Sequence, residues 1–140
     1  MGRILAIDYG RKRVGVAVTD ELKMIAGGLC TVHSKDAIDF IKNYCKNEDV
    51  ECIVVGEPVD MQMRASEASR YIEPFIKQLR KQIPHISVER TDERFTSQMA
   101  MQAMRDAGLG KKARQNKSLV DTISATIMLQ YYLEKLANSG

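Results

Sequence analysis

The run Cys52–Gly56 most constrains the fold, because it is continuously apolar and shows no alternation with polar residues. Such a run is typical of a strand buried on both faces, which means a parallel strand at the centre of a sheet. Parallel strands are joined by crossover connections that are usually helical. The run therefore predicts an α/β domain, and Pro58 ends the strand.

The remaining patterns predict one mixed sheet covered by helices on both faces. Apolar and β-branched runs predict four more strands, and helical spacing of apolar residues predicts four helices. The first three strands read as an antiparallel meander, followed by right-handed βαβ crossovers. The strands are Arg3–Tyr9, Val14–Thr19, Ala26–Val32 and Ile86–Arg90, and the helices are Lys35–Asn47, Arg64–Gln82, Thr96–Ala107 and Leu119–Leu136.

Three local signals refine these elements. The pair Gly27-Gly28 predicts a bulge in the third strand. Ser34 is the expected N-cap of the first helix. Pro74 lies inside the second helical pattern and predicts a bend near residues 70–74.

Length and composition indicate one ordinary globular domain, residues 1–140, large enough to fold without metal or disulfide staples. Hydrophobic residues make up 44% and charged residues 28%, which argues against disorder and against a membrane protein. The N-terminal apolar stretch Ile4–Ile7 is too short for a signal peptide. We expect a cytoplasmic protein that does not bind membranes.

The cysteines and histidines do not form a metal site by spacing. Cys30, Cys45 and Cys52 contain no CxxC pair, so we expect buried, reduced thiols. His33 and His85 have no neighbouring ligand residues. Transition-metal chemistry through nitrogen and sulfur ligands is therefore excluded.

Asp8 interrupts an apolar row in the first strand. Alternation puts Ile4, Ala6 and Asp8 on one face, where a carboxylate needs a partner or a cation. One alternative is that Asp8 only starts a turn with Gly10 or pairs with a cation of Arg11–Arg13. The carboxyl ends of parallel strands are where α/β sheets keep their sites, which makes Asp8 a candidate catalytic residue.

Asp121 is unusual in the last predicted helix for a similar reason. A period of 3.6 residues aligns it with Ala125, Met128 and Tyr132 on a stripe that should face the core. The stretch Ser118–Asp121 also fits a capping box with an acid in the first turn, so a capping role stays open. A first turn packed on the sheet can bring Asp121 toward the end of the first strand.

More acids follow the other predicted strands. Asp92 and Glu93 come after Ile86–Arg90, although they also fit a pair of ordinary loop acids, and Glu57 follows the central strand. Three or four acids thus converge on one sheet edge without histidine or cysteine. Oxygen-only clusters select Mg²⁺ or Mn²⁺. Two such ions about 4 Å apart, with basic loops to hold phosphate, can hydrolyse a phosphodiester in line.

Positive charge is concentrated in two segments, residues 105–117 and Arg11–Arg13. The net charge of the chain is +3, but residues 105–117 hold five basic side chains against Asp106 alone. Solvated loops are one interpretation, and contacts to nucleic-acid phosphates are the other. The candidate phosphate contacts are Arg11, Lys12, Arg13, Arg94, Lys111, Lys112, Arg114 and Lys117.

Four ordered motifs resemble those of the YqgF/RuvX family. They are ILAIDYG at 4–10 followed by VGVA at 14–17, IVVGEP at 53–58, DERFTS at 92–97 and DTISA at 121–125. Two positions depart from the family pattern. Glu57 stands where leucine is more frequent and is either an extra metal ligand or a local variant, and Ser124 stands where alanine is more frequent.

The resemblance implies a ribonuclease H-like fold, with a mixed five-stranded sheet flanked by helices, related to the Holliday-junction resolvase RuvC. It implies that Asp8, Glu93 and Asp121 are the catalytic acids and ligands of Mg²⁺ or Mn²⁺. It also implies a cytoplasmic nuclease that matures the 5′ end of pre-16S ribosomal RNA, with ribosomal particles as potential partners. The sequence leaves the oligomeric state open.

Other functions remain as alternatives. A resolvase acting on branched DNA would need the same acids and basic loops. A weakly catalytic nucleic-acid-binding protein in ribosome assembly or transcription would keep the fold. An actin-like or sugar-kinase-like ATPase also begins with an Asp-x-Gly loop, but it needs a second lobe that 140 residues do not supply.

Overall fold

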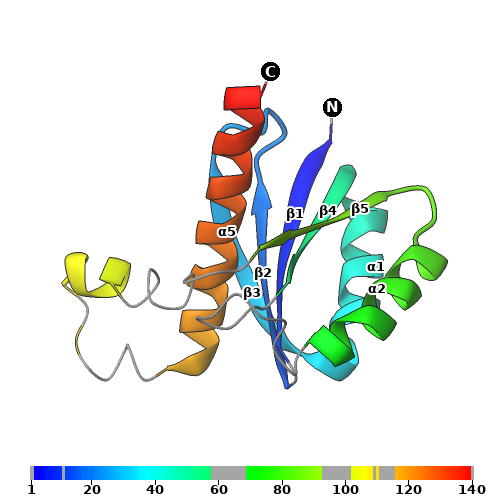
Figure 1. The fold of residues 1–140 in the computed structure, drawn as a ribbon, viewed down its shortest axis with the longest axis horizontal. Helices are drawn as coiled ribbons and strands as arrows, with labels where there is room; N and C mark the ends of the chain where they lie inside the picture. The colour runs from blue at the N-terminus through cyan, green and yellow to red at the C-terminus, as the bar shows by residue number, and fades with distance from the viewer. Residues whose placement is uncertain are drawn as a thin grey trace.

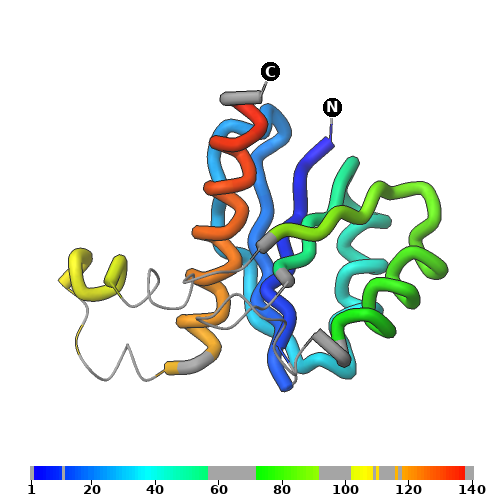
Figure 2. Tube along the Cα trace, in the orientation of Figure 1, coloured from blue at the N-terminus to red at the C-terminus, as the bar shows by residue number. Residues whose placement is uncertain are grey.

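The described part of the chain contains five strands together with helices and turns. The computed structural model describes residues 2–10, 12–57, 69–92, 102–108, 110 and 116–139 (Figures 1 and 2). Residues 102–106 are helical. In chain order the other elements are β1 (Arg3–Tyr9), β2 (Arg13–Thr19), β3 (Ala26–His33), the 3₁₀ turn η1 (Ser34–Asp36), α1 (Ala37–Asn47), β4 (Val50–Glu57), α2 (Ser69–Gln82), β5 (Ser87–Asp92) and α5 (Lys117–Ser139).

The sheet has the strand order β3-β2-β1-β4-β5. β2 pairs antiparallel with β1 and β3, while β4 pairs parallel with β1 and β5. This confirms the antiparallel meander followed by parallel crossovers. It also confirms that the continuous apolar run lies in a central parallel strand.

Alternate residues of the strands form two separate cores. Leu5, Ile7, Ile53 and Val55 face α1 and α2 and pack with a larger set of buried residues that includes Ile41 and Leu79. Ile4, Ala6, Ala17 and Val54 face α5 and pack on Ala125, Met128 and Leu129. Helices therefore cover both faces of the sheet, as the strand pattern predicts (Figure 1).

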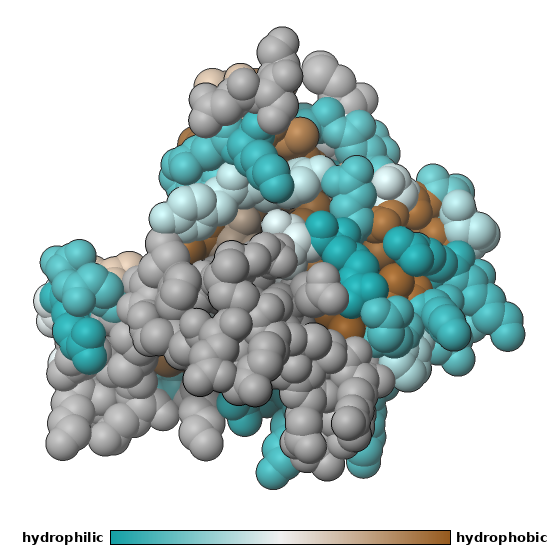
Figure 3. Space-filling view, in the orientation of Figure 1, coloured by the Kyte–Doolittle hydropathy of each residue, from teal (hydrophilic) through white to brown (hydrophobic). Residues whose placement is uncertain are grey.

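The outer surface of α1 and α2 is polar. Figure 3 shows mainly hydrophilic side chains on this side of the molecule, with hydrophobic atoms visible between them. Among the side chains of α2 that the structure describes, residues 72–82, the buried ones are Ile72, Phe75, Ile76 and Leu79, which recur at helical spacing. Pro74 lies within the same helix, on its exposed side.

Two predicted caps are wrong. Ser34 does not cap the first helix, because the Nδ1 atom of His33 accepts the Lys35 N–H and η1 precedes α1. Ser118 does not cap the last helix, because α5 begins at Lys117 and the Asn116 side chain accepts the Leu119 N–H at 3.2 Å. Asn116 therefore satisfies one of the free donors of the first turn of α5.

The predicted bulge lies next to the expected pair of glycines. In the β2–β3 pairing, Val16 faces Cys30 while Ala17 faces Gly28, so Leu29 is the extra residue on β3. Of the predicted helices 64–82 and 96–107, the parts 64–68 and 96–101 lie outside the described residues. The cysteines are free, and they are half-buried rather than fully buried.

The backbone of α5 lies directly on the sheet at two glycines. A Cβ atom added to Gly15 of β2 would lie 2.2 Å from the carbonyl oxygen of Asp121. A Cβ atom added to Gly28 of β3 would lie 2.7 Å from the Cγ2 atom of Thr122. The first contact is the more restrictive, because backbone cannot move aside as a side-chain tip can. The absence of a side chain at Gly15 thus sets the distance between α5 and β2.

We predict that Gly15→Ala destabilises the protein, because the added methyl group forces α5 away from the sheet. Overpacking of this kind costs about 1–3 kcal/mol in unfolding free energy. Gly27→Ala is the matched control, since the nearest atom to its added Cβ is the Val18 carbonyl oxygen at 3.9 Å. Urea denaturation of both variants measures the difference, and equal stabilities would contradict the close contact.

Candidate active site

Asp8 and Asp121 lie at the same end of the molecule. β1 runs toward the end at which α5 begins (Figure 1). Asp8 is directly opposite Gly15 in the β1–β2 pairing, and the Asp121 backbone rests on Gly15. The two acids are far apart in sequence, and this close contact helps to bring them together.

Asp8 carries the clearest electrostatic signal of the described residues. It is half-buried in the row that continues Ile4 and Ala6. Burial, and then the nearby negative charge of Asp121, raise the pKa of Asp8 from 3.8 to about 7. A carboxylate that is this costly to ionise is typical of functional sites, where a cation offsets the cost.

Asp121 has a cationic partner, and that partner is Arg13. The Nε atom of Arg13 donates to the Oδ2 atom of Asp121 at 2.8 Å. The alternative that a cation of Arg11–Arg13 pairs with Asp8 therefore does not hold for Arg13. The capping alternative for Asp121 is also wrong, since Asp121 is the fifth residue of α5 and Asn116 serves as the cap.

The other predicted site residues are only partly within the described structure. Lys12 is exposed beside Arg13, and Lys117 is the first residue of α5. The predicted residues outside the described part are Arg11, Glu93, Arg94, Lys111, Lys112 and Arg114. Within residues 2–10, 12–57, 69–92, 102–108, 110 and 116–139, no group of three or more His, Cys, Asp or Glu side chains is placed to hold a metal ion.

The strand register separates Glu57 from Asp8. Gly56 is the residue level with Asp8 in the β1–β4 pairing. Glu57 is one position further along and is level with Asp92 of β5. Asp8 and Gly56 are therefore the residues that share a rung of the sheet at this edge.

A match to a family model covers residues 2–135, and its description is RuvX, Holliday junction resolvase. The chain belongs to the RuvX family. A relative from Phocaeicola vulgatus is 62% identical over 134 residues and covers 96% of each chain. A relative from Bacteroides fragilis is 56% identical and covers 96% of this chain and 97% of its own. Both carry the name "Putative pre-16S rRNA nuclease".

The solved structures assign the fold. Thermus thermophilus RuvC in complex with a Holliday junction superposes with a TM-score of 0.55 at 15% sequence identity and covers 96% of both chains. At this identity the similarity concerns the fold alone. The RuvX chain therefore has the ribonuclease H-like fold of RuvC, as the resemblance of its motifs implies.

Sequence reasoning missed the contacts that hold the start of α5 on β3. The Oγ1 atom of Thr31 lies 2.7 Å from the Ser118 carbonyl oxygen and 2.6 Å from the Oγ1 atom of Thr122. Gly15 and Arg13 were not linked to Asp121 either. The predicted strand began at Val14, whereas β2 begins at Arg13, and only the observed strand places Arg13 and Gly15 at alternate positions on one face.

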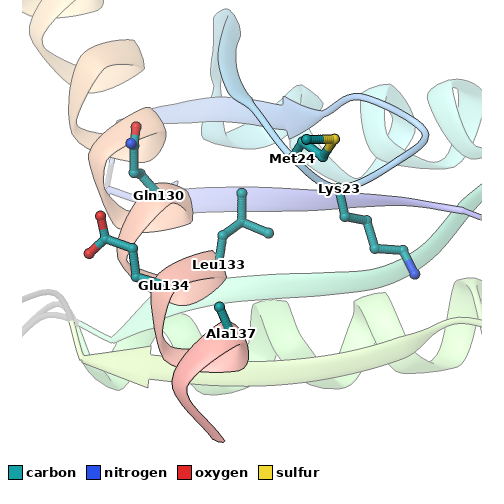
Figure 4. A pocket seen from close by; sticks show the side chains of 6 residues that line it. All are labelled: Lys23, Met24, Gln130, Leu133, Glu134 and Ala137. Carbon is teal, nitrogen blue, oxygen red and sulfur yellow. The ribbon is translucent and has the colours of Figure 1, made fainter. Parts of the chain in front are cut away.

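A groove lies at the other end of α5. Figure 4 shows its lining residues, with Lys23 and Met24 on the β2–β3 turn and Gln130, Leu133, Glu134 and Ala137 on α5. Gln130 is nine residues beyond Asp121, which is about 14 Å along a helix. The groove is therefore separate from the acids. Among the described helices, none is long and apolar enough to cross a membrane.

We predict that Asp8→Asn stabilises the metal-free protein at pH 8. An acid whose pKa is raised by folding binds its proton more tightly in the folded state, so stability falls as pH rises from about 4 to about 7. The loss is on the order of 4 kcal/mol above pH 7, and asparagine does not incur it. Thermal melts of both proteins should diverge between pH 4 and pH 8.

Asp39→Asn is the control for this experiment, because Asp39 is an exposed acid on α1, across the sheet from α5. A variant Asp8→Asn that tracks the wild type at every pH would show that Asp8 is not held in a costly ionised state.

Proposed function

We propose that this RuvX chain is a single-domain, metal-dependent endonuclease that hydrolyses phosphodiester bonds in the 5′-end maturation of pre-16S ribosomal RNA. The observation that carries the proposal is the meeting of Asp8 and Asp121 at the end of β1, where burial and like charge make ionisation of Asp8 costly. The names of the relatives, at 56–62% identity, support the choice of substrate. Such a substrate implies a cytoplasmic location.

The donor set at this site fits a hard divalent cation. Asp8 and Asp121 offer only carboxylate oxygens, which Mg²⁺ and Mn²⁺ prefer. Glu93, which lies outside the described residues, is the proposed third ligand. When bound, such an ion polarises the phosphodiester and stabilises the charge that develops on it.

The residues of the chain have distinct roles in this proposal. Asp8, Glu93 and Asp121 hold the cation and thereby fix where the scissile phosphate can lie. The basic residues grip the backbone on either side, which orients the strand without reading its bases. These proposed contacts are Arg11, Lys12, Arg13, Arg94, Lys111, Lys112, Arg114 and Lys117.

A Holliday-junction resolvase is the second candidate. The description of the matching family model names this activity, and a four-way junction presents the same phosphates as RNA. The two candidates differ in substrate and share the site, so a direct comparison of substrates separates them.

We predict metal-dependent cleavage of a precursor 16S RNA fragment, with a synthetic four-way DNA junction cut more slowly or left intact. The assay incubates both substrates with Mg²⁺ or Mn²⁺, and with chelator as the blank. Cleavage of the junction alone would assign the resolvase function. Binding of RNA with no cleavage in either metal would overturn the nuclease proposal in favour of a binding protein.

Asp8→Asn should abolish cleavage and leave RNA binding in place, because it removes a metal ligand and no phosphate contact. The measurement is the single-turnover cleavage rate alongside RNA affinity. Asp39→Asn again serves as the surface control. Full metal-dependent cleavage by Asp8→Asn would remove Asp8 from the proposed site.

Replacing Lys111 and Lys112 with alanine should weaken RNA binding similarly for all sequences. Each phosphate contact releases about one counterion when the RNA binds. Loss of two contacts should therefore reduce the magnitude of the slope of log K against log salt by roughly 1–2. Lys46→Ala with Lys81→Ala is the matched control, since both lysines are exposed on α1 and α2, across the sheet from α5. An unchanged affinity and slope would identify the basic segment as a solvated loop.

A further inference from the structure

The ion pair between Arg13 and Asp121 joins two groups that the sequence treats separately, a candidate phosphate contact and a candidate metal ligand. Arg13 begins β2, two residues before Gly15, and so lies on the α5 face of the sheet. Its Nε atom is 2.8 Å from the Oδ2 atom of Asp121, and the two side chains are 38% and 24% exposed. The pair is therefore partly shielded, unlike most surface ion pairs.

The backbone on both sides of this pair is held in place. The Asp121 carbonyl oxygen rests on Gly15, and α5 is anchored next to it through Thr31 and Thr122. On the other side, the Ser34 N–H donates to the Lys12 carbonyl oxygen at 3.0 Å. The packing of these two backbone segments therefore brings Arg13 and Asp121 within reach of each other.

The geometry of the contact leaves atoms of both partners available. It uses the Nε atom of the guanidinium and one carboxylate oxygen. Within the described part of the chain, no hydrogen bond engages Oδ1 of Asp121 or the two terminal nitrogens of Arg13. Oδ1 can therefore accept a cation, and the terminal nitrogens can donate to a phosphate oxygen, while the existing bond stays in place.

The ion pair between Arg13 and Asp121 lies beside a second negative charge, that of Asp8. The carboxylates of Asp8 and Asp121 place two like charges at the same end of the sheet, on either side of Gly15. The Arg13 guanidinium adds a positive charge beside these two acids and bonds to one oxygen of the Asp121 carboxylate. Groups that orient a metal-ligating carboxylate affect metal affinity typically by 10–100-fold.

Lys12 provides the contrast. It is exposed, and the ion pairs between described residues do not include it. A lysine in this position suits a simple phosphate contact, whereas Arg13 is already engaged by Asp121.

We propose that Arg13 is a positioning residue that holds the Asp121 carboxylate beside Asp8 with Oδ1 directed to the cation, and that links this ligand to a phosphate of the substrate through its terminal nitrogens. The proposal rests on the proposed nuclease function. It assigns different roles to Lys12 and Arg13, although both are basic neighbours at the start of β2.

The test compares Arg13→Gln with Lys12→Gln. Arg13→Gln should weaken the Mg²⁺ midpoint of thermal stabilisation by about 10–100-fold and lower kcat more than it raises KM. Lys12→Gln should leave that midpoint unchanged, weaken RNA binding and reduce the salt slope by about 1. Lys46→Gln, an exposed lysine on α1, is the control for loss of a surface charge.

A double-mutant cycle with Asp121→Asn isolates the route by which Arg13 acts. If Arg13 acts on the cation through Asp121, Arg13→Gln should add no further loss of Mg²⁺ response in the Asp121→Asn background. Arg13→Lys keeps the charge and addresses folding. It should fold like the wild type and still show a weakened Mg²⁺ midpoint, because an ammonium lacks the fork that serves two partners.

The outcomes separate this role from the proposed function. If Arg13→Gln behaves like Lys12→Gln, or if its Mg²⁺ midpoint and kcat equal those of the wild type, the positioning role is overturned while the nuclease stands. A wild-type Mg²⁺ midpoint in Arg13→Lys would likewise overturn the positioning role, because it would show that only the positive charge of Arg13 matters. A wild type with neither a Mg²⁺ response nor cleavage overturns the proposed function and this role together.

Discussion

The backbone of α5 approaches the sheet so closely at Gly15 that no side chain fits between them. Gly15 is level with Asp8 on the neighbouring strand, so the same contact that seats the helix also brings Asp121 to Asp8. Thr31 and Thr122 hold the helix at this height, and Gly28 gives it room on β3. The position of the candidate site therefore depends on backbone packing, which is harder to disturb than a contact between side chains.

The pair of carboxylates at the end of β1 is unfavourable for stability, whereas the apolar core beneath the sheet is favourable. Burial makes Asp8 costly to ionise, and the nearby negative charge of Asp121 adds to that cost. Among the described residues, the side chains buried between the sheet and the helices α1 and α2 are apolar, so their burial stabilises the fold without such repulsion. Sites that are held under strain by a stable surrounding structure are a recurrent feature of enzymes. Arg13 forms an ion pair with the second of these carboxylates, that of Asp121.

The two ends of α5 differ in chemistry. Its first turns carry Asp121 and the threonine contacts to β3, while its last turns line a groove with the β2–β3 turn. Exposed apolar side chains, including Met24 and Ile25, gather at that second end. Charged groups that can hold a cation and phosphates lie at the first end. The division agrees with a substrate that is engaged where β1 ends.

Much of the architecture follows from local sequence patterns. The continuous apolar run predicted the central strand, and strand alternation predicted that Asp8 faces the same side as Ile4 and Ala6. The helical period predicted that Ala125 and Met128 are buried. These predictions succeeded because hydrophobic periodicity depends only on neighbouring residues and on the geometry of one element.

The N-terminal cap of α5 and the contact between Arg13 and Asp121 could not be predicted from local patterns. The choice of Asn116 over Ser118 as the cap depends on where α5 starts, and α5 starts at Lys117, one residue before the predicted cap. The partner of Arg13 lies more than one hundred residues away, and no periodic pattern links positions across such a distance. The sequence by itself thus determined the strands, the helices and the candidate acids. Only the tertiary structure decided which charges meet, because that depends on how closely two backbones can approach.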